Sequence, residues 1–326
     1  MSATPPLRFG LFVGQAGMTW DELRERFELA DELGFDHIWL VDHLMPTDPP
    51  YDRPMFEAWT SLAALAALTH RVRIGILVTS NTFRHPSVLA KQAVTVDHIS
   101  RGRLILGLGT GWHPEEHHRF GIDFPDAPER VDQLEEALDV IIALMSGEPA
   151  SFLGRHYRLD EALALPAPVQ QPRIPILIAA HRPRMLRLAA RRADMWDTFA
   201  TTEGTATEGI ASDLAERVRI FEEACRAAGR DPNGIRRSVW VGADRSGPFS
   251  SPDAYAQFVE HHQALGFTDL MAALPSPDRW AMVREIATTV IPALRVRQPA
   301  TATPGPSEPP KAITAGAGEE RGEKRA

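Results

Sequence analysis

Residues 109–121, GTGWHPEEHHRFG, gather histidines and glutamates at a spacing that could bind a metal. The run from His113 to His117 fits the H-x-x-E-H pattern of inverted zinc proteases. Such a site needs both histidines one turn apart within a helix, and a third ligand from elsewhere. Pro114 follows the first histidine, however, and proline favours the first position of a helix. His113 is therefore predicted to cap a short turn that ends at Gly121, and we expect no metal here.

The glycines before this stretch could also belong to a dinucleotide-binding loop. That fingerprint needs glycine at its first, third and sixth positions. The sixth residue counted from Gly107 is Trp112, and counted from Gly109 it is Pro114, so the match fails. Two interpretations remain: the glycines let a flat ligand or a phosphate approach the backbone, or they form a tight turn.

Two more polar groups follow apolar runs. Asp42 and His43 are adjacent, and neighbouring residues of a strand point to opposite faces, so one can face a pocket while the other supports it. A histidine can donate or accept a proton near neutral pH, although it can equally cap a loop. Thr79, Ser80 and Asn81 bring hydroxyl and amide groups to the end of another run, or only lead into the next helix.

Several reaction types lack the residues they need. A Schiff-base aldolase needs a lysine on a strand. The sequence has three lysines, Lys91, Lys311 and Lys324, against 32 arginines, and the first lies within a predicted helix. There is no G-x-S-x-G motif and no lysine after a phosphate-binding glycine loop. Nucleophilic acyl or phosphoryl transfer therefore has no evident carrier.

Composition narrows the class of protein further. The net charge of the 326 residues is −8, and residues 298–326 carry four acids and four bases, so the acidic excess lies on the remaining chain. This argues against nucleic acid or an anionic membrane as a partner. The single cysteine, Cys225, suits a reducing compartment. With no signal peptide and no apolar run near 18 residues, we expect a cytoplasmic protein.

Eight short apolar runs, each followed by an amphipathic stretch, predict the fold. The predicted strands are 7–15, 37–43, 72–80, 103–111, 174–180, 195–201, 236–243 and 267–274. The predicted helices are 19–35, 57–69, 85–100, 127–145, 182–193, 206–228, 252–265 and 277–291. Strict alternation implies parallel strands with helical crossovers, in a doubly wound sheet or a closed barrel.

Eight units of this length favour an α/β fold of the (β/α)8 TIM-barrel type. We expect residues 1–297 to form this domain and residues 298–326, which are rich in Pro, Ala and Gly, to be a disordered tail. In such barrels the chemistry lies on the loops at the C-terminal ends of the strands. The polar groups described above all follow predicted strands.

Residues 81–125, which include TVDHISRGRLILGLGTGW, resemble the bacterial luciferase-like flavin and deazaflavin oxidoreductases, most of all the branch that uses coenzyme F420. Residues 57–78, 154–159 and 175–197 fit the same pattern, and the likeness runs from about residue 7 to residue 292. It implies a TIM barrel with inserted loops, in which the cofactor ring lies across the strand ends.

The resemblance also implies roles for individual residues. In the family the third strand ends in a bulge, often with a non-prolyl cis peptide, packed against the ring; this falls at Thr79-Ser80-Asn81. Asp42 and His43 would be catalytic. The resemblance places further cofactor contacts at Gly109, Thr110, Gly111, Trp112, Ala179, Ala180 and His181. Arg182 and Met195 stand where similar sequences usually have glycine, and Arg182 could assist an anionic cofactor tail or block its approach.

The expected function is F420-dependent hydride transfer between the deazaflavin and a small organic substrate. His43 would supply a proton, Asp42 would orient it or bind the cofactor, and Trp112 and Phe199 would wall the substrate side. The acids of residues 113–121 are expected to be mostly solvated. The resemblance further suggests a homodimer and a reductase that supplies reduced cofactor.

Three alternatives remain open. The chain could be an FMN-dependent monooxygenase that uses reduced flavin and oxygen. It could be a barrel that binds cofactor without turnover, which the pairing of Asp42 with His43 argues against. It could also be a metal-dependent hydrolase using His43, His85 and His113.

Overall fold

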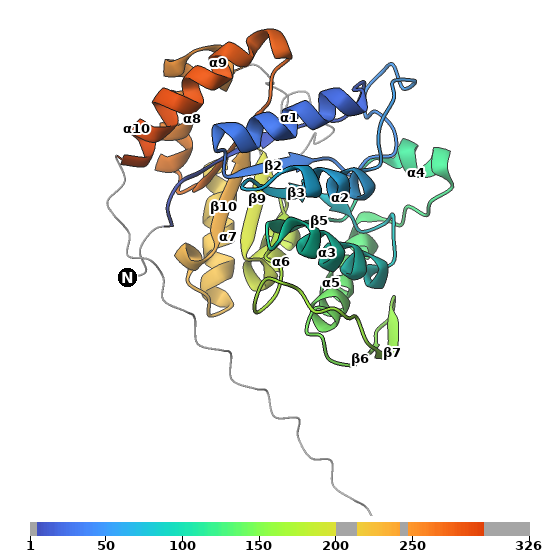
Figure 1. The fold of residues 1–326 in the computed structure, drawn as a ribbon. Coiled ribbons are helices and arrows are strands. Elements are labelled where there is room, and N and C mark those ends of the chain that lie inside the picture. Colours follow the sequence, from blue (N-terminus) through green and yellow to red (C-terminus); the bar gives the residue numbers. More distant parts are fainter. Residues whose placement is uncertain (1–4, 200–213, 242–246, 297–326) are drawn as a thin grey trace, which may run out of the picture.

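Parallel strands close into a barrel in the computed structural model, which describes residues 5–199, 214–241 and 247–296 (Figure 1). The barrel strands are β1 (Arg8–Phe12), β2 (His37–Leu40), β3 (Arg73–Ile76), β5 (Leu104–Gly109), β8 (Ile176–Ala179), β9 (Met195–Phe199), β10 (Arg236–Trp240) and β11 (Asp269–Ala273), and β4 (Thr79–Ser80) continues β3. Their order is β3-β2-β1-β11-β10-β9-β8-β5, and pairing of β3 with β5 completes the ring. The predicted TIM barrel is confirmed.

Helices surround the strands on the outside (Figure 1). They are α1 (Trp20–Leu33), α2 (Ala58–Leu68), α3 (Pro86–Ser100), α4 (Pro114–Phe120), α5 (Ala127–Leu144), α6 (Pro183–Arg192), α7 (Leu214–Ala227), α8 (Pro252–Ala264), α9 (Trp280–Glu285) and α10 (Ile291–Val296), with a π-helical turn at Ile286–Val290 between the last two. Across the described ranges, none of the helices is long and apolar enough to cross a membrane.

The predicted order of strands and helices is confirmed, with shorter strands than expected. α1 follows Thr19, the first residue of the predicted helix 19–35, where Thr19 and Glu22 form a reciprocal capping box, and it ends at Gly34 with a φ of 75°. The hairpin of β6 (Ala150–Leu153) and β7 (Arg158–Ala162) was not predicted. The tail 298–326, residues 206–213 of one predicted helix, and residues 200–201 and 242–243 of two predicted strands lie outside the described residues.

A bulge interrupts the third barrel strand, and it lies earlier than the family resemblance suggested. The non-prolyl cis peptide joins Leu77 to Val78, between β3 and β4, and not Thr79-Ser80-Asn81. Gly107 and Gly109 of β5 make room for it. A Cβ at Gly107 would overlap the carbonyl oxygen of Ile76, and one at Gly109 would lie 2.5 Å from Val78 Cγ2. Because these two residues of β5 are glycines, the irregular strand can pack closely beside β5.

The barrel interior is layered because alternate residues of each strand face inward. The middle layer is a buried apolar cluster of Trp39, Ile105, Leu177, Met195 and Met271. Towards the C-terminal ends of the strands this layer packs against Phe12, Leu77, Val78 and Trp240. The opposite end carries charged side chains at the first positions of β1, β3, β10 and β11. The two ends of the barrel therefore differ in chemistry.

Replacement of Gly107 by alanine tests the fit between β5 and the bulge. The added Cβ meets the backbone of Ile76, which cannot rotate away, so we expect Gly107→Ala to lower the free energy of unfolding by about 1–3 kcal/mol. Urea denaturation measures this change. Gly234→Ala is the control because nothing lies within 4 Å of the place that its Cβ would take. Equal midpoints for the two variants would contradict the proposed role of Gly107.

Candidate active site

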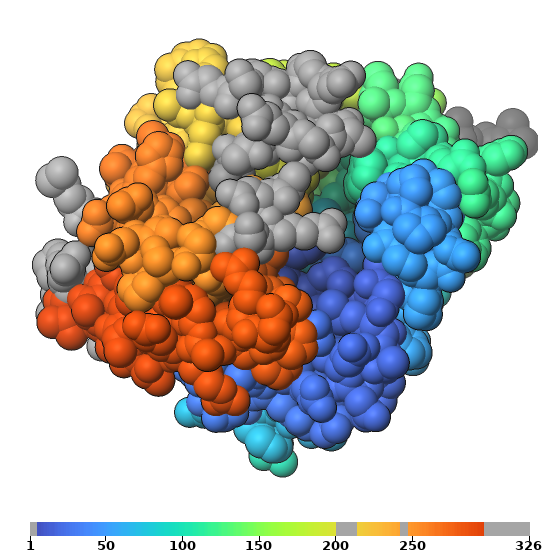
Figure 2. Space-filling model, turned by 90° about the horizontal axis from the view of Figure 1, so that it is seen from above, coloured from blue at the N-terminus to red at the C-terminus, as the bar shows by residue number. Residues whose placement is uncertain are grey.

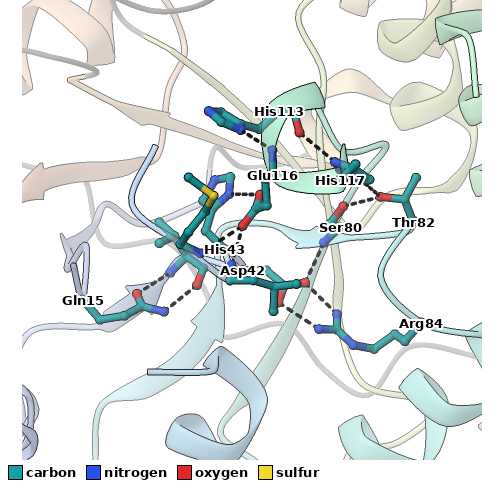
Figure 3. Close-up of polar contacts among 12 residues, drawn as sticks. Gln15, Asp42, His43, Ser80, Thr82, Arg84, His113, Glu116 and His117 are labelled. Carbon is teal, nitrogen blue, oxygen red and sulfur yellow. Dashed lines mark hydrogen bonds and ion pairs between the residues drawn. The ribbon is translucent and has the colours of Figure 1, made fainter. Parts of the chain in front are cut away.

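A histidine and a buried glutamate meet at the C-terminal face of the barrel (Figure 3). His43 follows β2, and its Nδ1 lies 2.8 Å from Oε2 of Glu116, which belongs to α4. The His43 side chain is 15% exposed, whereas that of Glu116 is fully buried. The other carboxylate oxygen accepts hydrogen bonds from the backbone N–H groups of Leu44 and Met45. One carboxylate therefore fixes both the His43 ring and the backbone that follows it.

These contacts decide the protonation of Glu116. Burial by itself raises a carboxyl pKa, but the hydrogen bond and charge of His43 and the amides of Leu44 and Met45 outweigh burial, so the pKa of Glu116 lies below its usual value. The prediction that the acids of this stretch are mostly solvated is wrong for Glu116. It holds for Glu115, which is exposed and pairs with Arg119 at 2.6 Å.

α4 presents Glu116 because of how the helix begins. The predicted cap is confirmed: Nδ1 of His113 accepts the Glu116 N–H at 3.1 Å, Pro114 occupies the first turn, and Gly121 ends the helix with a φ of 66°. His117 lies one turn after His113, and its Nδ1 is 2.7 Å from the carbonyl oxygen of His113. Its Nε2 lies 2.7 Å from the Thr82 hydroxyl, so both histidines are engaged in hydrogen bonds of the protein.

Asp42 supports the neighbouring strand and does not contact His43. Its buried carboxylate accepts a hydrogen bond from the Ser80 N–H at 2.8 Å and two from the Arg84 guanidinium, at 2.6 and 2.9 Å. This bidentate geometry is a strong charge-assisted interaction. The carboxylate that holds His43 is therefore Glu116, and Asp42 joins the end of β2 to β4.

The three polar residues at the end of the third strand lie at this face but are buried. Ser80 Oγ lies 2.8 Å from the Thr82 hydroxyl, and Asn81 donates to the Tyr157 hydroxyl at 3.2 Å. The Thr79 hydroxyl is fully buried and has no hydrogen-bond partner in the described part of the chain. Gly111, with a φ of 78°, lies against the hydroxyls of Ser80 and Thr82, where any side chain would collide.

Aromatic rings form a row across the strand ends. Phe12 stacks on Trp240 with ring centroids 4.6 Å apart, and Phe199 contacts Trp240 at 5.1 Å. His181 then stacks on Phe199 at 4.2 Å with an angle of 11° between the planes. All four side chains are half-buried. Burial, and next the nearby charge of Arg217, lower the pKa of His181 to about 3, so it is a neutral ring at physiological pH.

The remaining predicted residues lie on or just after β5 and β8, apart from Met195, which begins β9. Trp112, 48% exposed, meets the His43 ring edge-on at 5.5 Å. Thr110 is half-buried between Gly109, which ends β5, and Gly111. Ala179 ends β8 and Ala180 accepts the indole hydrogen bond of Trp196 at 2.9 Å. The exposed Arg182 occupies the N-cap of α6 without a side-chain cap hydrogen bond, and Met195 is buried in the apolar layer.

Figure 2 looks onto this face, where residues 44–56 (light blue) lie near residues 112–125 (green) beside a hollow. The guanidinium of Arg119 stacks over the Tyr51 ring at 5.0 Å and joins these two segments. Gln15, three residues after β1, is fully buried and exchanges hydrogen bonds with the backbone of Val41, which fixes the start of the loop before Asp42.

Sequence reasoning missed Glu116, Phe12 and Trp240. The signal for Glu116 was its position three residues after a histidine cap, where its backbone N–H can donate to the cap side chain. Spacing alone, however, does not say which of the two adjacent glutamates has a buried side chain. Phe12 and Trp240 are the last residues of β1 and β10, so the alternation of inward-facing positions could have identified them.

Removal of the buried charge tests the contact between Glu116 and His43. We expect Glu116→Gln to reduce the free energy of unfolding by about 1–3 kcal/mol at pH 7, because it leaves buried donors imperfectly paired. A carboxylate whose folded pKa is depressed stabilises the protein above its unfolded pKa and loses this effect as pH falls through the folded pKa. The difference between wild type and variant should therefore shrink as the pH is lowered below about 4.5.

Urea denaturation at several pH values measures this effect. Glu115→Gln is the matched control, since it removes the adjacent but exposed carboxylate, and its urea midpoint should stay close to that of the wild type. A variant at Glu116 as stable as this control at pH 7 would refute the assigned contact.

Comparison with known proteins places the chain in a family. The profile of the family described as "Luciferase-like monooxygenase" matches residues 5–245. The chain is 30% identical to the F420-dependent glucose-6-phosphate dehydrogenase of Microbacterium testaceum (strain StLB037), over 90% of this chain and 99% of that protein. It is 32% identical to the F420-dependent hydroxymycolic acid dehydrogenase of Mycobacterium tuberculosis (strain ATCC 25618 / H37Rv), over 73% of this chain and 64% of that protein.

A solved structure shares the fold. An F420-dependent secondary alcohol dehydrogenase in complex with an F420-acetone adduct superposes with a TM-score of 0.75 at 20% identity, covering 89% of this chain and 99% of that one. The family match covers most of the chain and agrees with the barrel, and the chain belongs to the luciferase-like monooxygenase family.

Proposed function

We propose that the protein is an F420-dependent oxidoreductase that transfers hydride between the deazaflavin and a small organic substrate. Relatives of 30–32% identity that are named F420-dependent dehydrogenases support the cofactor. The single observation that carries the reaction type is His43 at the barrel mouth, anchored through Nδ1 by the buried Glu116. The substrate is a molecule whose oxidation or reduction exchanges a hydride and a proton.

The residues at the mouth fit a flat cofactor with a phosphate-bearing tail. The half-buried rings of Phe12, Trp240, Phe199 and His181 offer an apolar surface for such a ring system. The buried Thr79 hydroxyl, which lacks a hydrogen-bond partner in the described part of the chain, supplies a polar group beneath it. The bound cofactor would accept or donate the hydride. We propose that Ser80, Asn81, Gly109, Thr110, Gly111 and Trp112 line the same site.

The N-terminus of α6 suits the anionic part of the cofactor. Arg182 at its N-cap makes no side-chain hydrogen bond to the first turn, and Pro183 follows. The first backbone N–H groups of a helix favour phosphate. Ala179, Ala180 and His181 lead into this turn, and we propose that they contact the phosphate-bearing tail. His181 is neutral and would act through its ring, whereas Arg182 is exposed and charged and can pair with the anion.

His43 can move the proton that accompanies the hydride. Glu116 holds Nδ1, which as an N–H donates to the carboxylate, and this leaves the Nε2 lone pair available. When an alcohol is oxidised, its C–H bond gives up a hydride and its O–H proton passes to Nε2 as the C=O bond forms. Reduction of a carbonyl runs in reverse, with Nε2–H donating to the oxygen. The negative charge of Glu116 stabilises the protonated ring in either direction.

The walls of the mouth would position the substrate. Trp112 meets the His43 ring edge-on, and its exposed face can cover a substrate bound at Nε2. Phe199, within the aromatic row, would form a second wall. Together they would exclude water from the space between the ring surface and His43. Asp42 acts as a positioning residue, because it contacts Ser80 and Arg84 and not His43.

Cofactor preference is tested by titration of the purified protein with F420 and with FMN, followed by quenching of tryptophan fluorescence. We expect tight binding of F420 and weak binding of FMN. Alcohols, enones and imines are then screened for turnover with oxidised or reduced F420. A reversed preference, with oxygen consumption in the presence of reduced FMN, would replace this proposal with the FMN-dependent monooxygenase. Binding of neither would reject both.

His43→Asn tests the proton transfer. We expect kcat with the best substrate of the screen to fall by about 10²–10⁴-fold, the usual contribution of a general acid or base, while the Kd for F420 changes by less than about threefold. His118→Asn is the control because His118 is an exposed histidine of the same helix as Glu116. An unchanged kcat in His43→Asn would remove His43 from the mechanism without affecting the assignment of the cofactor.

A further inference from the structure

Arginines gather at the end of the barrel opposite the active site. Arg8, Arg73 and Arg236 are the first residues of β1, β3 and β10. Because parallel strands begin at the same end of a barrel, these side chains lie together at its N-terminal face. Arg71, just before β3, and Arg295, on α10, extend the group. The whole chain has a net charge of −8, so a general excess of basic residues does not account for this cluster.

The cluster borders a pocket of about 460 Å³, within the usual range for small-molecule sites. Its walls are formed by Arg8, Gly34, Phe35, Asp36, Arg71, Arg73 and Arg295. Four of these seven residues are arginines and one is an acid. The pocket therefore has the composition of a site for an anion.

Few of these guanidinium groups are neutralised by a carboxylate. Arg295 pairs with Asp36 at 2.8 Å. Arg71 donates to the main-chain carbonyls of Asp31 and Glu32, which carry no net charge. Among the described residues, Arg8 has neither a hydrogen bond nor an ion pair for its guanidinium.

Arg73 is only partly satisfied. One Nη donates to Gln170 at 2.8 Å and more weakly to the carbonyl of Leu104, while its buried Nε has no hydrogen-bond partner within the described ranges. Two buried acids act on Arg73, and both have other partners: Asp97 accepts hydrogen bonds from Gln170, whereas Asp269 is bound to Arg236 at 2.7 Å and lies 3.5 Å from His37. Positive charge at the pocket thus exceeds the negative charge available to it.

The excess is costly to the folded protein. Burial, and next the charge of Arg8, lower the pKa of Arg73 to about 10. Burial, and then the charge of Arg236, also lower the pKa of Arg8. Both groups remain protonated at neutral pH, so they repel each other in a poorly hydrated place. A bound anion would remove this repulsion and provide the missing acceptors.

We propose that this pocket binds a small phosphorylated anion, at a site separate from the cofactor and substrate at the other end of the barrel. Planar guanidinium groups match the oxygens of phosphate by paired hydrogen bonds. Arg8 provides free donors, Arg73 and Arg71 add charge, and Phe35 and Gly34 form an uncharged wall. The apolar middle layer of the barrel lies between the two sites.

Calorimetric titration of the full-length protein with inorganic pyrophosphate, at constant ionic strength, tests the proposal. We expect one site in the wild type and at least a tenfold weaker affinity in Arg8→Gln. The Arg8 guanidinium has no hydrogen bond or ion pair among the described residues to lose, so we expect the melting temperature of the unliganded variant not to fall. Arg187→Gln is the control, since it removes an equal charge from an exposed position on α6 and should bind as the wild type does.

Each other outcome overturns the proposal. Absence of binding at millimolar pyrophosphate would show that the arginines serve the fold alone. Equal affinity in wild type and Arg8→Gln, or competition between pyrophosphate and F420, would place the anion elsewhere. If Arg187→Gln weakened pyrophosphate binding as much as Arg8→Gln does, the binding would reflect only the overall charge of the protein and not this pocket.

Discussion

The candidate site depends on the need of a buried carboxylate for hydrogen-bond donors. Glu116 has no access to water, and three donors from the segment after β2 surround it: the His43 ring and the amides of Leu44 and Met45. This one contact fixes the position of α4 relative to β2, and it also fixes which nitrogen of His43 faces the mouth. Asp42 does the same on the other side, because its carboxylate joins β2 to Ser80 and Arg84. The adjacent residues Asp42 and His43 therefore connect the end of β2 to two neighbouring segments. Asp42 connects it to β4, and His43 connects it through Glu116 to α4, which follows β5.

Periodicity predicted the barrel because each strand and helix is long enough to show its own pattern. Local chemistry also predicted both ends of one short helix correctly, since it begins at the His113 cap and ends at Gly121. Contacts between distant segments were beyond such reasoning. Glu115 and Glu116 are equivalent in the sequence, and only the position of His43, 73 residues away, makes one of them buried. The cis peptide was expected at Thr79-Ser80-Asn81, two residues after its actual position, because that position depends on glycines of another strand.

Glycines explain why the mouth can be both irregular and well packed. Gly107 and Gly109 leave space on β5 for the bulge of the third strand, so that Val78 packs into the interior beneath the aromatic row. Gly111 then brings its backbone against the hydroxyls of Ser80 and Thr82. Larger side chains at these three positions would occupy the space that the bulge and the two hydroxyls take up here. The GLGTG stretch is thus explained by contacts within the protein, in addition to any approach it allows to a ligand.

The two ends of the barrel illustrate how one set of strands can present opposite chemistry. Along β1, Arg8, Gly10 and Phe12 share the inward face, so five residues lead from a guanidinium to an aromatic ring. Gly10 lacks a side chain because the His37 ring occupies that space, and His37 in turn accepts a hydrogen bond from Trp39 at 2.6 Å. The apolar layer above it separates the charged end from the mouth. An anion bound among the arginines would therefore stabilise the barrel by relieving repulsion between them, and need not change the geometry around His43.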